Sequence, residues 1–333
     1  MNNYAPYLNL FKIFTFLCYL DLIFSFPIYS YAIYYMLYRA HRHIRNNYRF
    51  FLLSKIIWNC LFENVTSGLA TIWFAPIQIA CPTGFIGYFG IPSVIWQSIL
   101  GCLAHALPVS ISHLFFYRLK SSIWPSSWYK PHDRFGTLFF YSLYVIGFIF
   151  YTKEVIHQGT SQDRLEYAEN FTGFPEVFWR DDDFCYISSV KNVTGASHNL
   201  PLLLVFTVTT LLLYFMPIAT IIIIQKKFKK QNSRNANFQR NLLNSLLVQF
   251  SISFLMYTIP STINQSSFFI NWFNPAIVQI CQIIVQIHGS FVVVSMFFAT
   301  SAFKKDLIED LKIMVKKDYR KKESVIHVTS VCT

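Results

Sequence analysis

Four polar side chains inside apolar segments are the residues of this sequence best suited to bind a ligand. Gln97 and His105 lie on one face of a predicted helix, and Gln279 and Gln282 lie on one face of another. Spacings of three, four, seven or eight residues bring side chains to the same side of a helix, so each pair belongs to a polar stripe. These stripes predict either a cavity that binds a small neutral or weakly polar molecule, or hydrogen bonds that only hold helices together.

No motif for catalysis or for a cofactor accompanies these residues. The sequence lacks a Gly-rich phosphate loop, His-Glu-x-x-His, Cys-x-x-Cys and Gly-x-Ser-x-Gly. His41 and His43 stand among arginines, whose charge would repel a metal ion. Glu63 lies in an apolar segment one turn after Asn59, where a carboxylate could bind an ion, act as a switch or pack as a protonated group. We therefore expect no enzyme, no cofactor and no metal site.

The elements that must position these residues are membrane-spanning helices. Hydrophobic residues make up 54% of the 333 residues and charged residues only 13%, which is about half the charged share of a typical soluble domain. Apolar blocks long enough to cross a bilayer alternate with polar stretches. We predict an all-α fold, with a seven-transmembrane helix bundle over residues 1–302 and a basic cytoplasmic tail over 303–333. The spans are expected near residues 14–38, 50–74, 88–114, 135–151, 200–224, 242–262 and 274–300.

The distribution of Lys and Arg predicts the orientation of the bundle. The segments after the first, third and fifth spans and the C-terminal tail carry four, four, six and eight of these residues, twenty-two in all, against five on the other side. Because basic residues collect in cytoplasmic loops, we expect the tail in the cytoplasm and the N-terminus outside the cell. The net charge of +12 then reflects topology and does not indicate nucleic-acid binding. Lys55, near the cytoplasmic end of the second span, is expected to extend toward the membrane surface.

The largest predicted outer loop covers residues 152–199 and is the only acidic one, with eight Asp or Glu residues. It contains glycosylation sequons at Asn170 and Asn192, and the shorter loop before the seventh span contains another at Asn264. Each sequon is a weak signal by itself. Their agreement with the charge distribution indicates that these loops are extracellular.

Two cysteines lie on the predicted extracellular side. Cys81 precedes the third span and Cys185 lies in the large outer loop, so both are in the oxidising compartment. A disulfide between them would hold the loop over the mouth of the bundle, and the alternative is two unrelated free thiols. The cysteines within the spans are expected to be small, unreactive hydrophobic residues: Cys18, Cys60, Cys102 and Cys281.

Several short segments together resemble a known family. They are, in chain order, Phe26-Pro27-Ile28, residues 76–92 (PIQIACPTGFIGYFGIP) followed by Gln97, Phe116-Tyr117-Arg118, residues 239–249 leading into Pro260, and His288-Gly289. Their order and spacing resemble those of the nematode serpentine chemoreceptors of the Srh group and its Str-superfamily relatives. The resemblance implies a G-protein-coupled chemosensory receptor in the plasma membrane of sensory neurons. The partners it implies are an odorant-like small molecule, a heterotrimeric G protein and membrane lipid.

Two motifs depart from the pattern of that family. Its members often read Glu-Asn-Arg where this chain has Phe116-Tyr117-Arg118, and Pro-Tyr-Arg where residues 301–304 read SAFK. Arg118 can still provide a basic residue at the inner end of the third helix. The candidate residues for G-protein coupling are Arg118, Lys226, Lys229 and Arg240. The basic loops that contain them could also do no more than set the topology.

A ligand-gated channel or transporter is the main alternative function. Such proteins usually show inverted repeats, broken spans or a charged pore helix. An odd number of spans does not suit a fold of two repeats, and the sequence shows no internal similarity. An insect-type odorant channel would place its N-terminus inside the cell, which the charge distribution opposes. A membrane enzyme is the third alternative, with only Glu63 and His105 to carry chemistry.

Overall fold

The computed structural model describes residues 8–42, 44, 46–74, 79–123, 129–156, 186–187, 215, 217–226, 234–269 and 274–313. Its long helices are α1 (Leu8–Tyr38), α2 (Asn46–Leu69), α3 (Ser93–Ile123), α4 (Tyr129–Ile156), α7 (Arg234–Ser253), α8 (Ile259–Phe269) and α9 (Pro275–Ala299). A shorter apolar helix covers Pro217–Lys226. Residues 301–313 form another helix after α9, here called the tail helix.

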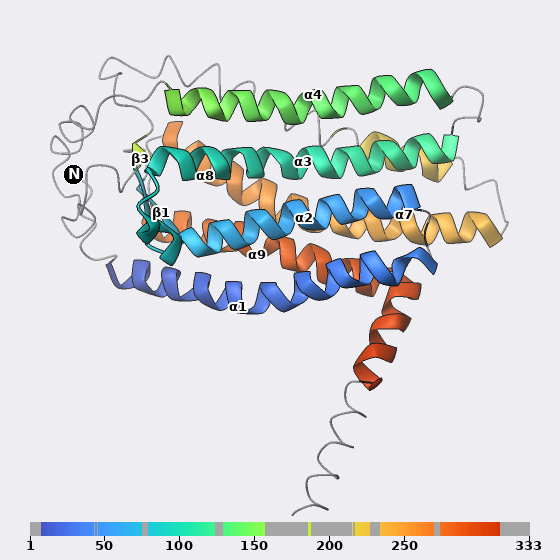
Figure 1. The fold of residues 1–333 in the computed structure, drawn as a ribbon, viewed down its shortest axis with the longest axis horizontal. Helices are drawn as coiled ribbons and strands as arrows, with labels where there is room; N and C mark the ends of the chain where they lie inside the picture. Colours follow the sequence, from blue (N-terminus) through green and yellow to red (C-terminus); the bar gives the residue numbers. More distant parts are fainter. Residues whose placement is uncertain are drawn as a thin grey trace, which may run out of the picture.

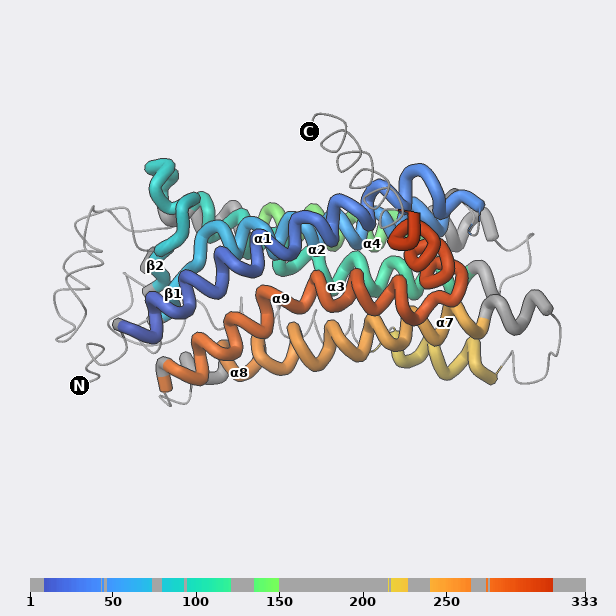
Figure 2. The backbone as a smooth tube through the Cα atoms, turned by 90° about the horizontal axis from the view of Figure 1, so that it is seen from below, coloured from blue at the N-terminus to red at the C-terminus, as the bar shows by residue number. Residues whose placement is uncertain are grey.

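The helices lie side by side in one elongated bundle (Figure 1). α1 packs against α2 and α9, α2 also packs against α3, α3 against α4, and α7 against α9. Seen from the second direction, α7 and α8 run along the edge opposite to α1 and α2 (Figure 2). The main apolar core joins five of these helices, with contributions from Tyr35, Leu52, Leu114, Leu246 and Phe297.

The predicted sixth span is one continuous helix with a change of pitch. α7 passes into a π-helical turn, η5 (Phe254–Thr258), and then into α8. Pro260 follows this turn by two residues. Because proline lacks an N–H and its ring clashes with the carbonyl four residues earlier, the regular hydrogen-bond pattern cannot continue through this point. A π turn before the proline is one way in which a helix accommodates that gap.

The outside of the bundle is apolar, whereas many of its polar side chains are inside. Phe16, Ile23 and Phe24 of α1 are 60 to 65% exposed. Such a surface requires lipid as its solvent. Among the described residues, four helices are long and apolar enough to cross a bilayer: Asn9–Tyr38, Ile95–Lys120, Arg240–Asn264 and Ala276–Ala299. α2 is not among these four because polar residues such as Lys55 and Glu63 lower its hydropathy.

A small antiparallel sheet closes one end of the bundle, at the left of Figure 1, and this end is here called the sheet end. β1 (Thr71–Phe74) pairs with β2 (Ile79–Pro82), with Thr71 opposite Pro82, and β2 pairs with β3 (Tyr186–Ile187). α2 therefore ends at Leu69 and not at 74 as predicted. Ala70 has a positive φ of 45°, which breaks the helix. The β-branched and aromatic residues that follow favour an extended chain.

The other predicted boundaries also shift. α3 begins at Ser93 and not at 88, because residues 85–89 form a 3-10 turn, and it continues to Ile123. α4 runs from Tyr129 to Ile156, so both helices are longer than predicted. Of the predicted fifth span, the described part is the helix Pro217–Lys226. Asn264 lies inside α8 and packs toward α9, so it is not in the loop that its sequon suggested.

The opposite end of the bundle, here called the tail end, carries the tail helix. The predicted tail begins at residue 303, yet Phe303 is 1% exposed and packs in the main core. Residues 301–313 are therefore part of the folded bundle.

Candidate functional site

Glu63 is the centre of a polar cluster between α1, α2 and α9. Its side chain is fully buried. The Tyr29 hydroxyl and the Ser290 backbone N–H each donate to Oε2 over 2.7 Å, and the Ser290 hydroxyl donates to Oε1. Three donated bonds offset the cost of removing a carboxyl group from water. These bonds join α1, α2 and α9, so the Glu63 side chain holds three helices together.

Gly289 makes this close packing of α9 against α1 and α2 possible. A Cβ atom at this position would meet the Tyr29 hydroxyl oxygen and Glu63 Oε2. Any larger residue would have to push the carboxyl group away from Ser290. The glycine is therefore required by the approach of other side chains and not by an unusual backbone angle.

More hydrogen bonds join the helices between Glu63 and the sheet end. The Ser67 hydroxyl of α2 donates to Asp21 Oδ2 of α1 over 2.6 Å. Gln286 of α9 accepts a bond from Cys18 Sγ over 3.1 Å and donates to the Thr66 carbonyl oxygen over 3.4 Å. These groups satisfy one another, and their arrangement holds three helices together.

Two of the predicted ligand residues, Gln97 and Gln279, carry buried oxygens without a partner. Gln279 of α9 is 1% exposed, and its Nε2 donates to the Trp73 carbonyl oxygen of β1 over 3.4 Å. Within the described structure, Gln279 Oε1, Gln97 Oε1 on α3 and Thr71 Oγ1 on β1 make no hydrogen bond. Buried polar atoms are nearly always paired, so each of these needs an explanation. A donor from a bound molecule would supply the missing bond.

The other two predicted ligand residues contact neighbouring helices. Gln282 Oε1 accepts a bond from Asn264 Nδ2 of α8 over 3.4 Å. His105 Nε2 is 3.1 Å from the Leu143 carbonyl oxygen of α4, and Gly147 of α4 leaves room for the imidazole ring. His105 therefore contacts α4, and its place in a lining shared by the third and seventh helices stays a prediction. A helical stripe shows which residues share a face but not which neighbour that face meets.

A chain of buried hydrogen bonds joins α2, α7 and α9 near the tail end, here called the tail-end chain. Lys55 Nζ donates to Gln249 Oε1 over 2.9 Å, and Gln249 Nε2 donates to Ser245 Oγ over 3.3 Å. The Thr300 hydroxyl donates to the same Ser245 oxygen over 2.9 Å. Lys55 is 3% exposed and lies among apolar side chains such as Leu52. It does not extend to the membrane surface as predicted, because Gln249 provides an acceptor inside the bundle.

The predicted coupling residue Arg118 is covered at the tail end. Its guanidinium carbon lies 3.7 Å from the centroid of the Tyr48 ring, and the residue is 6% exposed. This is a cation–π contact between α3 and the start of α2. Lys226 is exposed at the end of its helix, and Arg240 is half-buried in α7. Of the predicted coupling residues that the structure describes, Arg118 is the least accessible to solvent and Lys226 the most accessible.

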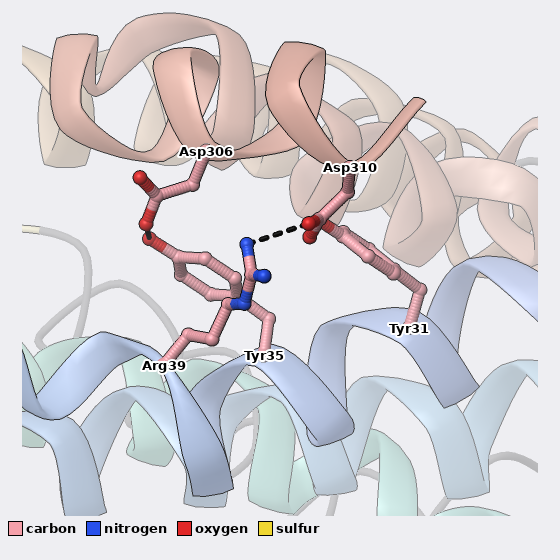
Figure 3. Close-up of polar contacts among 5 residues, drawn as sticks. All are labelled: Tyr31, Tyr35, Arg39, Asp306 and Asp310. Carbon is pink, nitrogen blue, oxygen red and sulfur yellow. Dashed lines mark hydrogen bonds and ion pairs between the residues drawn. The ribbon is translucent and has the colours of Figure 1, made fainter. Parts of the chain in front are cut away.

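The tail helix is fixed to α1 by polar contacts (Figure 3). The Tyr35 hydroxyl donates to Asp306 Oδ2 over 2.9 Å, and the Tyr31 hydroxyl donates to Asp310 Oδ2 over 3.0 Å. Arg39 Nη1 lies 2.6 Å from Asp310 Oδ1. Asp306 and Asp310 are one helical turn apart, so both face α1. The tail helix thus has one side bound to the bundle and one side free.

Cys81 in β2 is disulfide-bonded, whereas Cys18, Cys60, Cys102 and Cys281 are free thiols. Cys185 lies outside the described residues. Tyr186, the residue after it, pairs with Ala80, the residue before Cys81.

Some of the remaining predicted sites cannot be placed in the structure. Asn170, Asn192 and Lys229 lie outside the described residues. Within the described part of the chain, no group of three or more His, Cys, Asp or Glu side chains could hold a metal ion.

Comparison with solved structures identifies the fold of this bundle. The chain superposes on squid rhodopsin with a TM-score of 0.62, over 92% of this chain and 87% of that one, at 11% sequence identity. At so low an identity the match shows the fold alone. The fold is a seven-transmembrane helix bundle like that of rhodopsin.

The family follows from the sequence match. The model of the family described as "Serpentine type 7TM GPCR chemoreceptor Srh" matches residues 11–313. The chain belongs to the Srh family of serpentine seven-transmembrane chemoreceptors, and the predicted fold and resemblance are confirmed. It is a membrane receptor of the G-protein-coupled type. A comparison with curated proteins found no match.

Several residues of the two polar networks were missed by sequence reasoning. Ser245 and Gln249 of the tail-end chain recur with Ser253, which donates to the Gln249 carbonyl oxygen, every four residues in an apolar span. This is the same signal that singled out Gln97. Tyr29 and Ser290 gave no such signal because single hydroxyl groups are common in membrane helices.

Proposed function

We propose that this receptor binds a small molecule in the half of the bundle near the sheet end and signals to a heterotrimeric G protein from the tail end. Membership of a chemoreceptor family and the rhodopsin-like fold support a receptor of this type. The observation that carries the ligand site is the pair of buried, unpartnered amide oxygens of Gln97 and Gln279.

The proposed orientation places the sheet end outside the cell and the tail end in the cytoplasm. The Lys and Arg count supports it. The disulfide at Cys81 in β2 gives independent support, since disulfides persist in oxidising compartments. We also propose Cys185 as the partner of Cys81, because β3 begins directly after it and the β2–β3 register brings the chain alongside.

The chemistry of the sheet-end half indicates the kind of ligand. Gln279 Nε2 is engaged by the Trp73 carbonyl, so the free group of this side chain is an acceptor. No Asp, Glu, Lys or Arg occurs between Glu63 and Arg118, and Asp21 of α1 already accepts a bond from Ser67. The ligand that fits is a small neutral or weakly polar molecule that donates a hydrogen bond.

Coupling would require the tail end to change shape. Arg118 is covered by Tyr48, and the tail-end chain holds α7 against α2 and α9. In the proposed mechanism, ligand binding favours an arrangement in which α7 separates from these helices and the basic residues around Arg118 reach the G protein. The π turn η5 and Pro260 lie between the two ends of this span and provide the hinge.

The test is a response assay in cells that express the receptor. A panel of small neutral alcohols, ketones and amides is applied while a reporter of G-protein dissociation and the whole-cell current are recorded together. For an agonist found in this way, Gln97→Leu and Gln279→Leu should raise the half-maximal concentration about tenfold, since each loses one buried hydrogen bond. Ile280→Leu, a lipid-facing change beside Gln279, serves as the control.

Two results would contradict the proposal. Normal agonist responses in both glutamine variants, at surface levels equal to the wild type, would show that the ligand binds elsewhere. An agonist-gated current that persists when G proteins are blocked would show that the chain conducts ions itself.

A further inference from the structure

We propose that the 3-10 turn η3 (Phe85–Phe89), together with Ile91, is a membrane-contacting element that rests in the interfacial layer of the bilayer at the sheet end. This segment is here called the aromatic turn. None of the residues of η3 is buried. Phe85 is 43% exposed, Tyr88 64%, Phe89 68% and Ile91 39%. Large apolar side chains that gather at one exposed place indicate a surface that another molecule covers.

The depth of the aromatic turn can be read from its contacts with α1. The Phe85 ring lies 6.4 Å from the ring of Tyr19, and Thr83, just before the turn, is 2.7 Å from Thr15 through their hydroxyl oxygens. Lys12, the exposed basic residue of α1 nearest the sheet end, precedes Tyr19 by seven residues, which is about 10 Å along the helix. The turn therefore lies on the bundle side of Lys12, where α1 already faces lipid.

The lipid-facing surface of α1 continues at this level. Ile13 is 56% and Phe16 60% exposed, and further along α1 Ile23 and Phe24 are each 65% exposed. Figure 2 shows the chain after β2 standing out sideways from the bundle, and not along its long axis. A sideways projection at this depth meets the bilayer rather than bulk water.

The turn is held firmly on the side that faces the protein. The Gly84 N–H donates to the Leu69 carbonyl oxygen over 2.7 Å, and the Thr83 hydroxyl donates to the Ala70 carbonyl oxygen over 2.7 Å. A Cβ at Gly84 would meet the backbone of Gly68 and Leu69. The backbone at the start of the turn is thus held in place before the aromatic rings meet a partner, which lowers the entropy cost of the contact.

The composition of the turn favours a lipid partner. It contains phenylalanine and tyrosine rings without any charged group, and amphipathic aromatic rings are enriched where a membrane meets water. A partner protein recognised through charge would find no counterpart here. A second copy of the chain could cover the same surface, and the experiment below separates the two.

The test measures where a probe on the turn resides. Three single variants are made, each carrying a new cysteine: Phe89→Cys on the turn, Phe24→Cys on the lipid-facing side of α1, and Asn9→Cys at the exposed start of α1. Each receptor is reconstituted as a single copy in phosphatidylcholine nanodiscs, where both faces are accessible. A water-soluble maleimide is applied, and labelling of the wild-type chain is subtracted. In parallel, a nitroxide on the same cysteine reports its collisions with oxygen and with a water-soluble nickel chelate.

We expect Phe89→Cys to react about tenfold more slowly than Asn9→Cys, and its nitroxide to meet oxygen more often than the chelate, as for Phe24→Cys, because the apolar side chains of the turn reach the acyl-chain side of the interface, where charged solutes enter poorly. Labelling as fast as that of Asn9→Cys would overturn the proposal and place the turn in water. A nitroxide that meets neither reagent would overturn it by showing protein cover. Protection that appears only with two copies per disc would assign the surface to a dimer. None of these outcomes depends on the ligand or on G-protein coupling.

Discussion

Replacing Glu63 tests whether the polar cluster between α1, α2 and α9 holds the bundle together. Two effects oppose each other. Removing a buried carboxyl group relieves its desolvation cost. It also leaves the Tyr29 hydroxyl, the Ser290 hydroxyl and the Ser290 N–H without their acceptor. Because all three donors are directed at this one carboxyl group, we expect the free-energy cost of leaving them unpaired to exceed the desolvation energy that is recovered.

The loss in free energy of unfolding can be worked out from the number of hydrogen bonds removed. Measured side-chain hydrogen bonds between membrane helices average about 0.6 kcal/mol and reach about 1.7 kcal/mol. With three bonds lost, Glu63→Ala should lower the free energy of unfolding by about 2 to 5 kcal/mol. Glu63→Gln retains one acceptor oxygen but turns an N–H₂ group toward donors, so it should cost about 1 to 2 kcal/mol. Tyr29→Phe removes a single donor and should cost less than about 1.7 kcal/mol.

The measurement is thermal unfolding of the purified receptor in detergent without ligand. We expect the midpoint temperature to be highest for the wild type and to fall in the order Tyr29→Phe, Glu63→Gln, Glu63→Ala. Ser295→Ala is the control, because its hydroxyl bonds only to the carbonyl oxygen of Val292 in its own helix. A midpoint for Glu63→Ala equal to or above that of the wild type would refute the reasoning, since it would mean that desolvation outweighs the three bonds.

Two further predictions concern α9 and α7. Gly289→Ala should lower the midpoint of thermal unfolding by an amount that corresponds to about 1 to 3 kcal/mol, because its Cβ overlaps Tyr29 and Glu63; an unchanged midpoint would show that α9 can move aside. Gln249→Leu should raise ligand-free G-protein activation, since it removes the acceptor that ties Lys55 of α2 to α7, and a bond to a charged group is worth about 1.5 to 3 kcal/mol. If the variant has the same basal activity per receptor at the cell surface as the wild type, the tail-end chain does not restrain activation.

Much of the fold could be predicted because a bilayer imposes strong and local constraints on sequence. A span must be apolar for about 20 residues, and Lys and Arg collect on one side. These rules act on neighbouring residues and can be read along the chain, so α1 and α9 fall close to their predicted spans. The end of α2 could not be found in this way. Residues 71–74 are as apolar as the helix before them, and hydropathy alone does not reveal the positive φ of Ala70 or the pairing with β2 that make them a strand.

The polar residues show what the tertiary structure decided. The sequence by itself determined that Glu63, Gln97, His105 and Gln279 are polar groups in apolar helices that must avoid lipid. It could not determine their partners, because the acceptors and donors lie on other helices. Ser290 is 227 positions from Glu63 along the chain. His105 meets α4 and Gln279 meets β1 only because the helices pack in this order. Periodicity fixes a face within one helix, whereas the packing of all helices fixes what each face contacts.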